Sequence, residues 1–412
     1  MIPKLDQRLR KSWRLLRRRF RNIAERPLRL AIEKAHWSND ARCPVMLMVD
    51  DLTNAWHSRS GGRAWEPGGD WGGGLREPGS ALQLLEERLL REFPEVRITF
   101  FVVAGAISPY SRHQPFSYAA SLDATPKSRD FFRDLSRDPR FELAYHGFNH
   151  GTPGARTEDF MQEWRGFPSR EAAVEQTQAG LEIFRRAVGS LPQGGKYGGW
   201  DYNDFAGDAV DDCGFLWWCR DWMPRDVTGR TPHGYYEPQF FGKNLVLALP
   251  STVHGQFWDR RQIDLLLARR QIIAVEEHIA PVRPDGLIQT PNIVDDMDEL
   301  KRLFRYLRRK HVWYTTATEL ASYTVARERS LIYDVERDAF SLRYDGRFEK
   351  PMLTLRIGSA SLCTAMHPAV DVIAPDGTIV PADECQFDKI SHQHLVTVPV
   401  MNGKYRVRPR AA

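Results

Sequence analysis

The feature that most constrains this chain is a run of five apolar residues, 45–49, that ends in two adjacent aspartates, Asp50 and Asp51. Such a run predicts a strand that is buried on both faces, as in a parallel sheet covered by helices. Unpaired buried carboxylates are costly, so a pair at a strand end usually holds a metal, meets a cation or shares a proton. The alternative is that one aspartate caps the next helix and the other is solvated. The pair alone leaves both interpretations open.

Strand-like and helix-like patterns alternate along the chain after this run. Further strands are predicted at residues 98–103, 141–145, 215–219, 245–249, 272–276 and 312–315. Helical patterns are predicted at residues 80–93, 131–135, 174–188, 263–267 and 297–307, and after Thr316, where Thr316 and Glu319 form a capping box. Repeated strand–helix alternation predicts a parallel α/β architecture, and this number of strands favours a barrel of seven or eight strands over an open sheet.

The pattern changes near residue 330. Short strand-like runs at 330–333, 352–355, 370–373 and 394–398 are separated by turns, which predicts a small antiparallel β-sandwich. We therefore expect three parts: an N-terminal segment, 1–40, an α/β barrel, 41–328, and an accessory β-sandwich, 329–412. The β-sandwich shows no catalytic cluster, so we expect a role in packing or in glycan binding.

The charge of the chain is concentrated at its N-terminus. Residues 1–34 contain twelve Lys or Arg and three acidic residues, a net charge of +9, so the overall +5 leaves −4 for the remainder. The main body therefore has no basic field for nucleic acid. Residues 4–26 predict a basic amphipathic helix, which either meets an anionic membrane surface or an acidic partner, or packs on its own domain.

Several absences narrow the setting. The chain has no apolar run near the roughly 18 residues that a membrane span needs, and its N-terminus lacks the apolar core of a secretory signal. We therefore expect a cytoplasmic protein, with peripheral contact to the inner membrane face if the basic helix binds lipid. The five cysteines show no CxxC spacing, which argues against a disulfide framework or a thiolate zinc site.

A pair of histidines follows the third predicted strand. His146 and His150 are four residues apart, a spacing that brings two imidazoles to one side of a turn. The alternative is two ordinary histidines, one capping and one exposed. In parallel barrels the chemistry lies at the C-terminal strand ends, where this pair and Asp50/Asp51 both fall. Two imidazoles and a carboxylate leave positions open for water and substrate, which is typical of catalytic zinc.

Other strand ends also carry polar side chains or unusual loops. Residues 194–200 form a glycine-bracketed loop with Lys196 and Tyr197, whose backbone N–H groups could face a developing oxyanion, although a tight turn is the simpler explanation. Asp221 and Trp222 follow a further strand, and His278 ends another. The long loop 52–79 contains Trp71, and tryptophan faces stack on sugar rings.

With these motifs the chain resembles the polysaccharide deacetylases of carbohydrate esterase family four, which share a distorted (β/α) barrel. The first two motifs are the specific ones: paired aspartates after a strand, here Asp50 and Asp51, and His-x-x-x-His, here His146 to His150. The resemblance covers residues 43–325. It implies that Asp50 is the catalytic base and that Asp51, His146 and His150 bind a divalent metal, usually zinc.

The three remaining motifs of the family also have counterparts here, with the family's third motif in a divergent form. Lys196-Tyr197-Gly198 resembles the third motif, with Lys196 in place of an arginine that pairs with the base, a substitution that changes bidentate pairing to a point charge. Asp221-Trp222 resembles the fourth motif, and His278 resembles the fifth.

These observations lead to one leading hypothesis. We expect a metal-dependent hydrolase that removes N- or O-linked acetyl groups from a sugar, a polysaccharide or its precursor, in surface-polysaccharide biosynthesis. The base would be Asp50, the oxyanion donor the N–H of Tyr197, and the acid His278, tuned by a carboxylate such as Asp221; Trp71 and Trp222 would stack on the sugar. The alternatives are a glycan-binding protein without activity and a hydrolase of another acyl group, such as formyl.

Overall fold

The structure is a computed structural model that describes residues 29–55, 78–113, 119–222, 237–256, 258–281, 283, 287–358, 370–380, 385–388 and 393–409. The basic helix expected over 4–26 and the side chain of Trp71 lie outside these residues. The chain divides into two compact units, one formed by residues 41–325 and the other by residues 1–40 with 326–412. Among the helices described, none combines the length and the apolar content needed to cross a bilayer.

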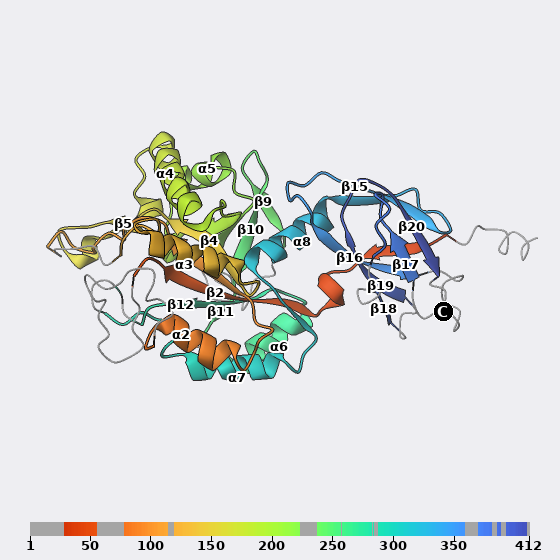
Figure 1. Ribbon diagram of the computed structural model, residues 1–412, viewed down its shortest axis with the longest axis horizontal. Coiled ribbons are helices and arrows are strands. Elements are labelled where there is room, and N and C mark those ends of the chain that lie inside the picture. The colour runs from red at the N-terminus through yellow and green to blue at the C-terminus, as the bar shows by residue number, and fades with distance from the viewer. Residues whose placement is uncertain are drawn as a thin grey trace, which may run out of the picture. The chain divides into compact units, whose positions relative to one another are not determined.

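The larger unit is organised around a curled, largely parallel sheet with helices on both of its sides (Figure 1). Its parallel strands, in spatial order, are β12 (Ile273–His278), β2 (Cys43–Leu52), β3 (Ile98–Val103), β4 (Phe141–Gly147), β7 (Gly194–Lys196), β8 (Trp217–Trp222) and β10 (Val246–Ser251). Strand β13 (Val312–Tyr314) pairs with the start of β2, and β9 (Gln239–Phe241) runs antiparallel to β10.

The two ends of this sheet meet, which makes it a distorted barrel. Strand β10 pairs with β8, and one residue later the same segment becomes β11 (Val253–His254), which pairs with β12. Between them, the N–H of Thr252 donates to the carbonyl of Ala274 on β12. The predicted distorted (β/α) barrel is therefore confirmed, with seven strand positions around its circumference.

Helices pack around the barrel largely where the apolar periodicity predicts them. They are α2 (Ala81–Leu84), which continues as the π-helical turn η3 (Leu85–Leu90), α3 (Pro126–Arg137), α4 (Arg170–Val188), α5 (Asp204–Asp212), α6 (Arg260–Ala268), α7 (Met297–Leu307) and α8 (Ala317–Arg329). Ser80 caps α2 by accepting from the N–H of Gln83, as expected. The capping box at Thr316 is confirmed: the carboxylate of Glu319 accepts from the N–H of Thr316, and the N–H of Glu319 donates to the Thr316 hydroxyl.

Short helical turns and strands lie in the loops, including those at the C-terminal ends of the barrel strands. They are η1 (Ser38–Asp40), β5 (Gly151–Thr152), η4 (Thr157–Asp159), β6 (Met161–Gln162), η5 (Glu163–Arg165) and η6 (Gly198–Trp200). The β5–β6 hairpin and η5 follow β4, so they lie next to the histidine motif in sequence.

The smaller unit contains two four-stranded antiparallel sheets. One consists of β1 (Ala31–Lys34), β16 (Met352–Gly358), β19 (Gln393–Pro399) and β18 (Cys385–Asp388), and the other of β14 (Ser330–Tyr333), β15 (Ala339–Tyr344), β20 (Gly403–Pro409) and β17 (Val370–Ile373). Alternate residues of β17 and β19 are buried, as expected for strands with one face on a core. The predicted small antiparallel sandwich is present, and it includes β1 from the N-terminal part of the chain.

Candidate metal centre

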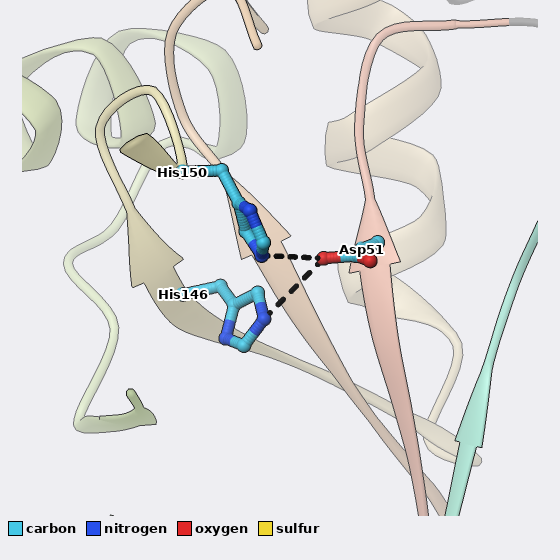
Figure 2. A group of neighbouring side chains, drawn as sticks. All are labelled: Asp51, His146 and His150. Carbon is cyan, nitrogen blue, oxygen red and sulfur yellow. Dashed lines mark ion pairs between the residues drawn. The ribbon is translucent and has the colours of Figure 1, made fainter. Parts of the chain in front are cut away.

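Three side chains from β2 and β4 and the loop after β4 converge on one point (Figure 2). Oδ1 of Asp51 lies 3.4 Å from Nε2 of His146 and 3.2 Å from Nε2 of His150. His146 is 1% exposed and His150 is 8% exposed. The structure therefore brings together the three residues that the sequence motifs nominated as metal ligands.

Irregular backbone aims these side chains at each other. Neighbouring residues of a regular strand point to opposite faces of the sheet, so Asp50 and Asp51 could not both face one site. The pairing of β2 with β3 shifts register between Val49 and Leu52, and Asp51 has a left-handed backbone with φ of 63°. The pairing of β3 with β4 shifts register at His146. Both strands thus bulge at a candidate ligand, a common device beside active sites.

The donor set and its spacing fit a divalent metal. A tetrahedral zinc ion with bonds of about 2.0–2.1 Å to nitrogen and oxygen holds its ligand atoms about 3.3 Å apart. The observed separations between the ligand atoms match this spacing. In addition, Oδ1 of Asp51 is buried and makes no hydrogen bond among the described residues. Nδ1 of His146 donates to the carbonyl of Lys196 over 3.1 Å, which leaves the lone pair of Nε2 facing Asp51.

The charges in and around the group also favour a cation. Asp50, Asp51 and Glu276 bring three negative charges and Lys196 one positive charge, so with neutral histidines the net charge is −2. A divalent ion would neutralise it. Burial raises the pKa of Asp51, but the charge of His150 and the contacts with both imidazoles outweigh burial and hold that pKa well below its usual value. Burial lowers the pKa of His150, and the Asp51 carboxylate more than offsets this and raises it.

A second buried network adjoins the first. The ammonium of Lys196, which is fully buried, lies 2.5 Å from Oδ2 of Asp50 and 2.9 Å from Oε1 of Glu276. Glu276 also accepts from Nε1 of Trp200 over 3.0 Å and from the hydroxyl of Ser251 over 3.1 Å. Its pKa is lowered, because Lys196 outweighs the effect of burial. Lys196 thus pairs with Asp50, as the motif suggested, and is itself held by Glu276.

The strand-end histidine His278 faces the same network. Nε2 of His278 lies 4.0 Å from Oδ2 of Asp50, while its Nδ1 lies 2.8 Å from the carbonyl of Pro291. A carbonyl can only accept, so Nδ1 carries the proton and Nε2 is the atom turned to the site. His278 is therefore placed to exchange a proton with a bound molecule near Asp50.

The loop that carries the second ligand is wrapped around one carboxylate. Oε2 of Glu163 accepts from the backbone N–H groups of Phe148, Asn149 and His150 at 3.0, 2.9 and 2.8 Å. Gly147 is required here, since its φ is 153° and a Cβ would come within 2.5 Å of Oε2 of Glu163. The next residue, Trp164, donates to the carbonyl of His146 over 2.9 Å. Residues 163 and 164 thereby hold both histidine positions.

The structure describes the side chains of only some of the other predicted site residues. Tyr197 directly follows Lys196, and its side chain is buried against Trp164 and Trp218. Asp221 and Trp222 belong to the end of β8, but their side chains lie outside the part of the chain that the structure describes. The role of the Tyr197 N–H and the roles of Asp221, Trp222 and Trp71 stay predictions.

Three residues of the site were missed by the sequence reasoning: Glu163, Trp200 and Glu276. Glu276 had a signal, because a charged residue inside an apolar strand, two positions before the strand-end His278, requires a buried partner. Trp200 closes the glycine-rich loop that was singled out, but nothing in the loop distinguished its role. Glu163 lies in an irregular stretch without a recognisable pattern.

No family model matches the chain, and no curated protein sequence matches it. Solved structures do match it. A probable polysaccharide deacetylase from Pseudomonas aeruginosa is 16% identical, with a TM-score of 0.42 over 70% of this chain and 93% of that one. The catalytic domain of a peptidoglycan N-acetylglucosamine deacetylase from Eubacterium rectale is 11% identical, with a TM-score of 0.32 over 67% and 89%.

A third structure, a carbohydrate esterase family 4 pseudoenzyme from Bacillus anthracis, is 14% identical, with a TM-score of 0.33 over 69% of this chain and 70% of that one. Identities and TM-scores this low assign no role to any single residue, so each role rests on that residue's own contacts. Solved structures to which this chain is similar include polysaccharide deacetylases and other proteins of carbohydrate esterase family 4, the family whose motifs the sequence resembles.

Proposed function

We propose that this protein is a metal-dependent hydrolase that removes N- or O-linked acetyl groups from a sugar, a polysaccharide or a polysaccharide precursor. The observation that carries the proposal is the convergence of Asp51, His146 and His150 directly beside the buried Asp50–Lys196 pair. A metal-ligand set next to a held carboxylate is the arrangement that acyl hydrolysis by an activated water requires.

Asp51, His146 and His150 would hold the metal, and their nitrogen and oxygen donors suit Zn²⁺. When bound, such an ion supplies Lewis-acid chemistry and makes water a nucleophile near neutral pH. The three ligands come from one side, which leaves room for water and the acyl oxygen. His146 is oriented through its bond to the Lys196 carbonyl, and His150 through the loop that Glu163 holds.

Asp50 is the general base in this proposal. Lys196 holds Oδ2 of Asp50, whereas Oδ1 makes no hydrogen bond among the described residues, so Oδ1 is the oxygen that takes the proton of the attacking water. The ammonium of Lys196 fixes the orientation of the Asp50 carboxylate. His278 returns a proton through Nε2 to the leaving amine or alcohol.

The test is the variant His146→Ala, compared with His311→Ala, which changes an exposed histidine. Metal content is measured by mass spectrometry after dialysis, and hydrolysis is measured with a chromogenic acetyl ester and with acetylated oligosaccharides. We expect His146→Ala to lose both metal and turnover, and the control to keep them.

Full metal content and activity in His146→Ala would overturn the ligand assignment. Tightly bound metal without any hydrolysis by the unmodified protein would favour the alternative, a glycan-binding protein on this fold. A larger rate enhancement over spontaneous hydrolysis for formyl than for acetyl in matched esters would favour a hydrolase of another acyl group.

A further inference from the structure

Trp200 has an unusual backbone at the edge of the candidate site. Its φ is 56°, in the left-handed region where a bulky side chain is rarely found. Asp51 and His150, two of the three candidate ligands, share this conformation with φ values of 63° and 66°. Strained residues persist only when their surroundings hold them, and they gather at functional sites.

The surroundings that hold Trp200 are the Lys196–Glu276 network. Nε1 of the indole donates to Oε1 of Glu276 over 3.0 Å, and Nζ of Lys196 lies 4.4 Å from the centre of a Trp200 ring. Both contacts are with buried charged groups, which makes the hydrogen bond charge-assisted and the cation–π contact poorly screened. The indole is thus fixed in position and orientation.

The loop that ends in Trp200 also touches the metal ligands. A Cβ at Gly198 would lie 3.0 Å from Nε2 of His150, so the loop passes directly against that imidazole. Two residues later, the Trp200 indole reaches the carboxylate beside Asp50 and Lys196. Trp200 is only half-buried, whereas Lys196, which contacts its ring, is fully buried, so Trp200 is the member of this contact that solvent reaches.

We infer that Trp200 is a substrate-contacting residue whose indole packs on the apolar face of a pyranose ring that carries the acetyl group. This inference rests on the proposed function and adds to it the residue that selects a sugar. A rigid indole presents a large apolar face at little cost in entropy, and sugar rings expose C–H groups that pack on such a face. Glu276 is the positioning residue that holds the indole in place.

Binding is tested by calorimetry on the full-length, zinc-loaded protein with Asp50→Asn as the background, so that ligand is not consumed. The probes are tetra-N-acetylchitotetraose and acetylated xylotetraose. We expect Trp200→Leu to weaken binding of the recognised sugar about tenfold, a loss of about 1.4 kcal/mol, and Trp200→Phe, which keeps a ring but loses the N–H, to weaken it less. Trp313→Leu is the matched control, because Trp313 is half-buried on β13, which pairs with the opposite end of β2.

Kinetics provide a second readout in the otherwise unmodified protein. Trp200→Leu should lower kcat/KM for the acetylated oligosaccharide about tenfold more than kcat/KM for 4-nitrophenyl acetate, which has no sugar. A disturbance of the fold or of the metal centre would instead lower both values by the same factor.

Unchanged sugar affinity in Trp200→Leu, or an equal loss in Trp313→Leu, overturns the inference. So does an Asp50→Asn protein with Trp200 intact that binds neither sugar at about 10 mM. If the proposed function fails, neither substrate is hydrolysed, yet the affinity difference between Trp200→Leu and Trp313→Leu still decides whether Trp200 contacts sugar.

Discussion

Gly198 lies directly against the candidate metal ligand His150. A Cβ there would stand 3.0 Å from Nε2 and 3.2 Å from Cδ2 of His150. Because Glu163 fixes the backbone of the loop that carries His150, the imidazole itself must shift to admit the added methyl group. We predict that Gly198→Ala lowers the metal affinity about tenfold or more, as measured by competition with a chelator of known affinity.

Gly207→Ala is the matched control for this substitution. Gly207 lies in α5, and the nearest atom to a Cβ there is the Tyr197 hydroxyl at 4.0 Å. Alanine favours a helix over glycine by roughly 1 kcal/mol, so this variant should keep its metal and gain stability. Equal metal affinity in Gly198→Ala and Gly207→Ala would show that the loop does not confine His150.

Glu277 is a second residue whose surroundings make a sharp prediction. It is fully buried on β12, and neither of its carboxyl oxygens has a hydrogen-bond partner among the described residues. Burial, together with the nearby Asp296 and Glu276, raises the pKa of Glu277 well above its usual value. The folded protein therefore keeps a proton here that the unfolded chain releases above about pH 4.5.

Because the folded protein keeps this proton, its free energy of unfolding falls as the pH rises. As the pH rises from about 4.5 towards the folded-state pKa, the Glu277 contribution to the free energy of unfolding falls by about 1.4 kcal/mol per pH unit. Glu277→Gln keeps the shape of the neutral acid and removes this loss. Denaturant unfolding should show the variant gaining stability over the unmodified protein as the pH rises from 5 to 8.

The exposed Glu175 on α4 offers the comparison, because Glu175→Gln changes the charge in the same way without burial. Its effect on unfolding should not change with pH over this range. A constant difference between Glu277→Gln and the unmodified protein would mean that Glu277 is ionised in the folded state.

At the scale of elements, the loop between β4 and β5 depends on η5 for its conformation. Glu163 on η5 accepts three consecutive backbone N–H groups of this loop, ending with that of the candidate ligand His150. A neutral amide has no charge and replaces one oxygen by an NH2 group, so Glu163→Gln weakens the bonds to Oε2 and loses the Phe148 bond to Oε1. We predict a fall of about 10- to 100-fold in metal affinity, the range typical of groups that orient ligands.

Glu158→Gln serves as the control for the loop, since Glu158 is exposed in η4 of the same segment. Metal affinity is compared by chelator competition, and circular dichroism checks that the barrel is intact. If Glu163→Gln bound metal as tightly as Glu158→Gln did, the three N–H bonds would not be what places His150.

At the scale of the whole molecule, the smaller unit takes a strand from the N-terminal part of the chain. Strand β1 pairs antiparallel with β16 from Ala31 opposite Gly358 to Lys34 opposite Leu355. Nζ of Lys34 also donates to the carbonyl of Ser330 over 3.0 Å. Deleting residues 1–34 removes this edge strand and exposes the backbone of β16.

We predict that deletion of residues 1–34 lowers the melting temperature of the smaller unit by several degrees, the result of losing a few kcal/mol. Deletion of residues 1–28 is the control, because it keeps β1. Calorimetry on both proteins makes the comparison, and equal melting temperatures would exclude a structural role for β1. The shorter deletion is also the one with which to test, by liposome flotation, our proposal that the basic N-terminal segment contacts anionic membranes.

Much of the fold could be predicted because its information is local. The apolar run of β2, the bounds of β3 and the extent of α7 follow from burial patterns within each element. Strand β15 was not predicted, because its buried and exposed residues follow no strict period. Strand β20 was also missed, although buried Tyr405 and Val407 alternate there with exposed basic residues. Strand β1 was missed for another reason: its partner β16 is more than three hundred residues away.

The sequence by itself determined which chemistry was available: two aspartates, the two histidines of His-x3-His and a final histidine stand at the ends of buried strands, and parallel strands end on the same side of a barrel. Only the tertiary structure decided how these groups meet. Bulges at Asp51 and His146 broke the alternation of side chains, and the contacts of Lys196 and Trp200 with Glu276 joined two segments that lie 76 to 80 residues apart in sequence. Such contacts are set by strand register and barrel closure, which local patterns do not encode.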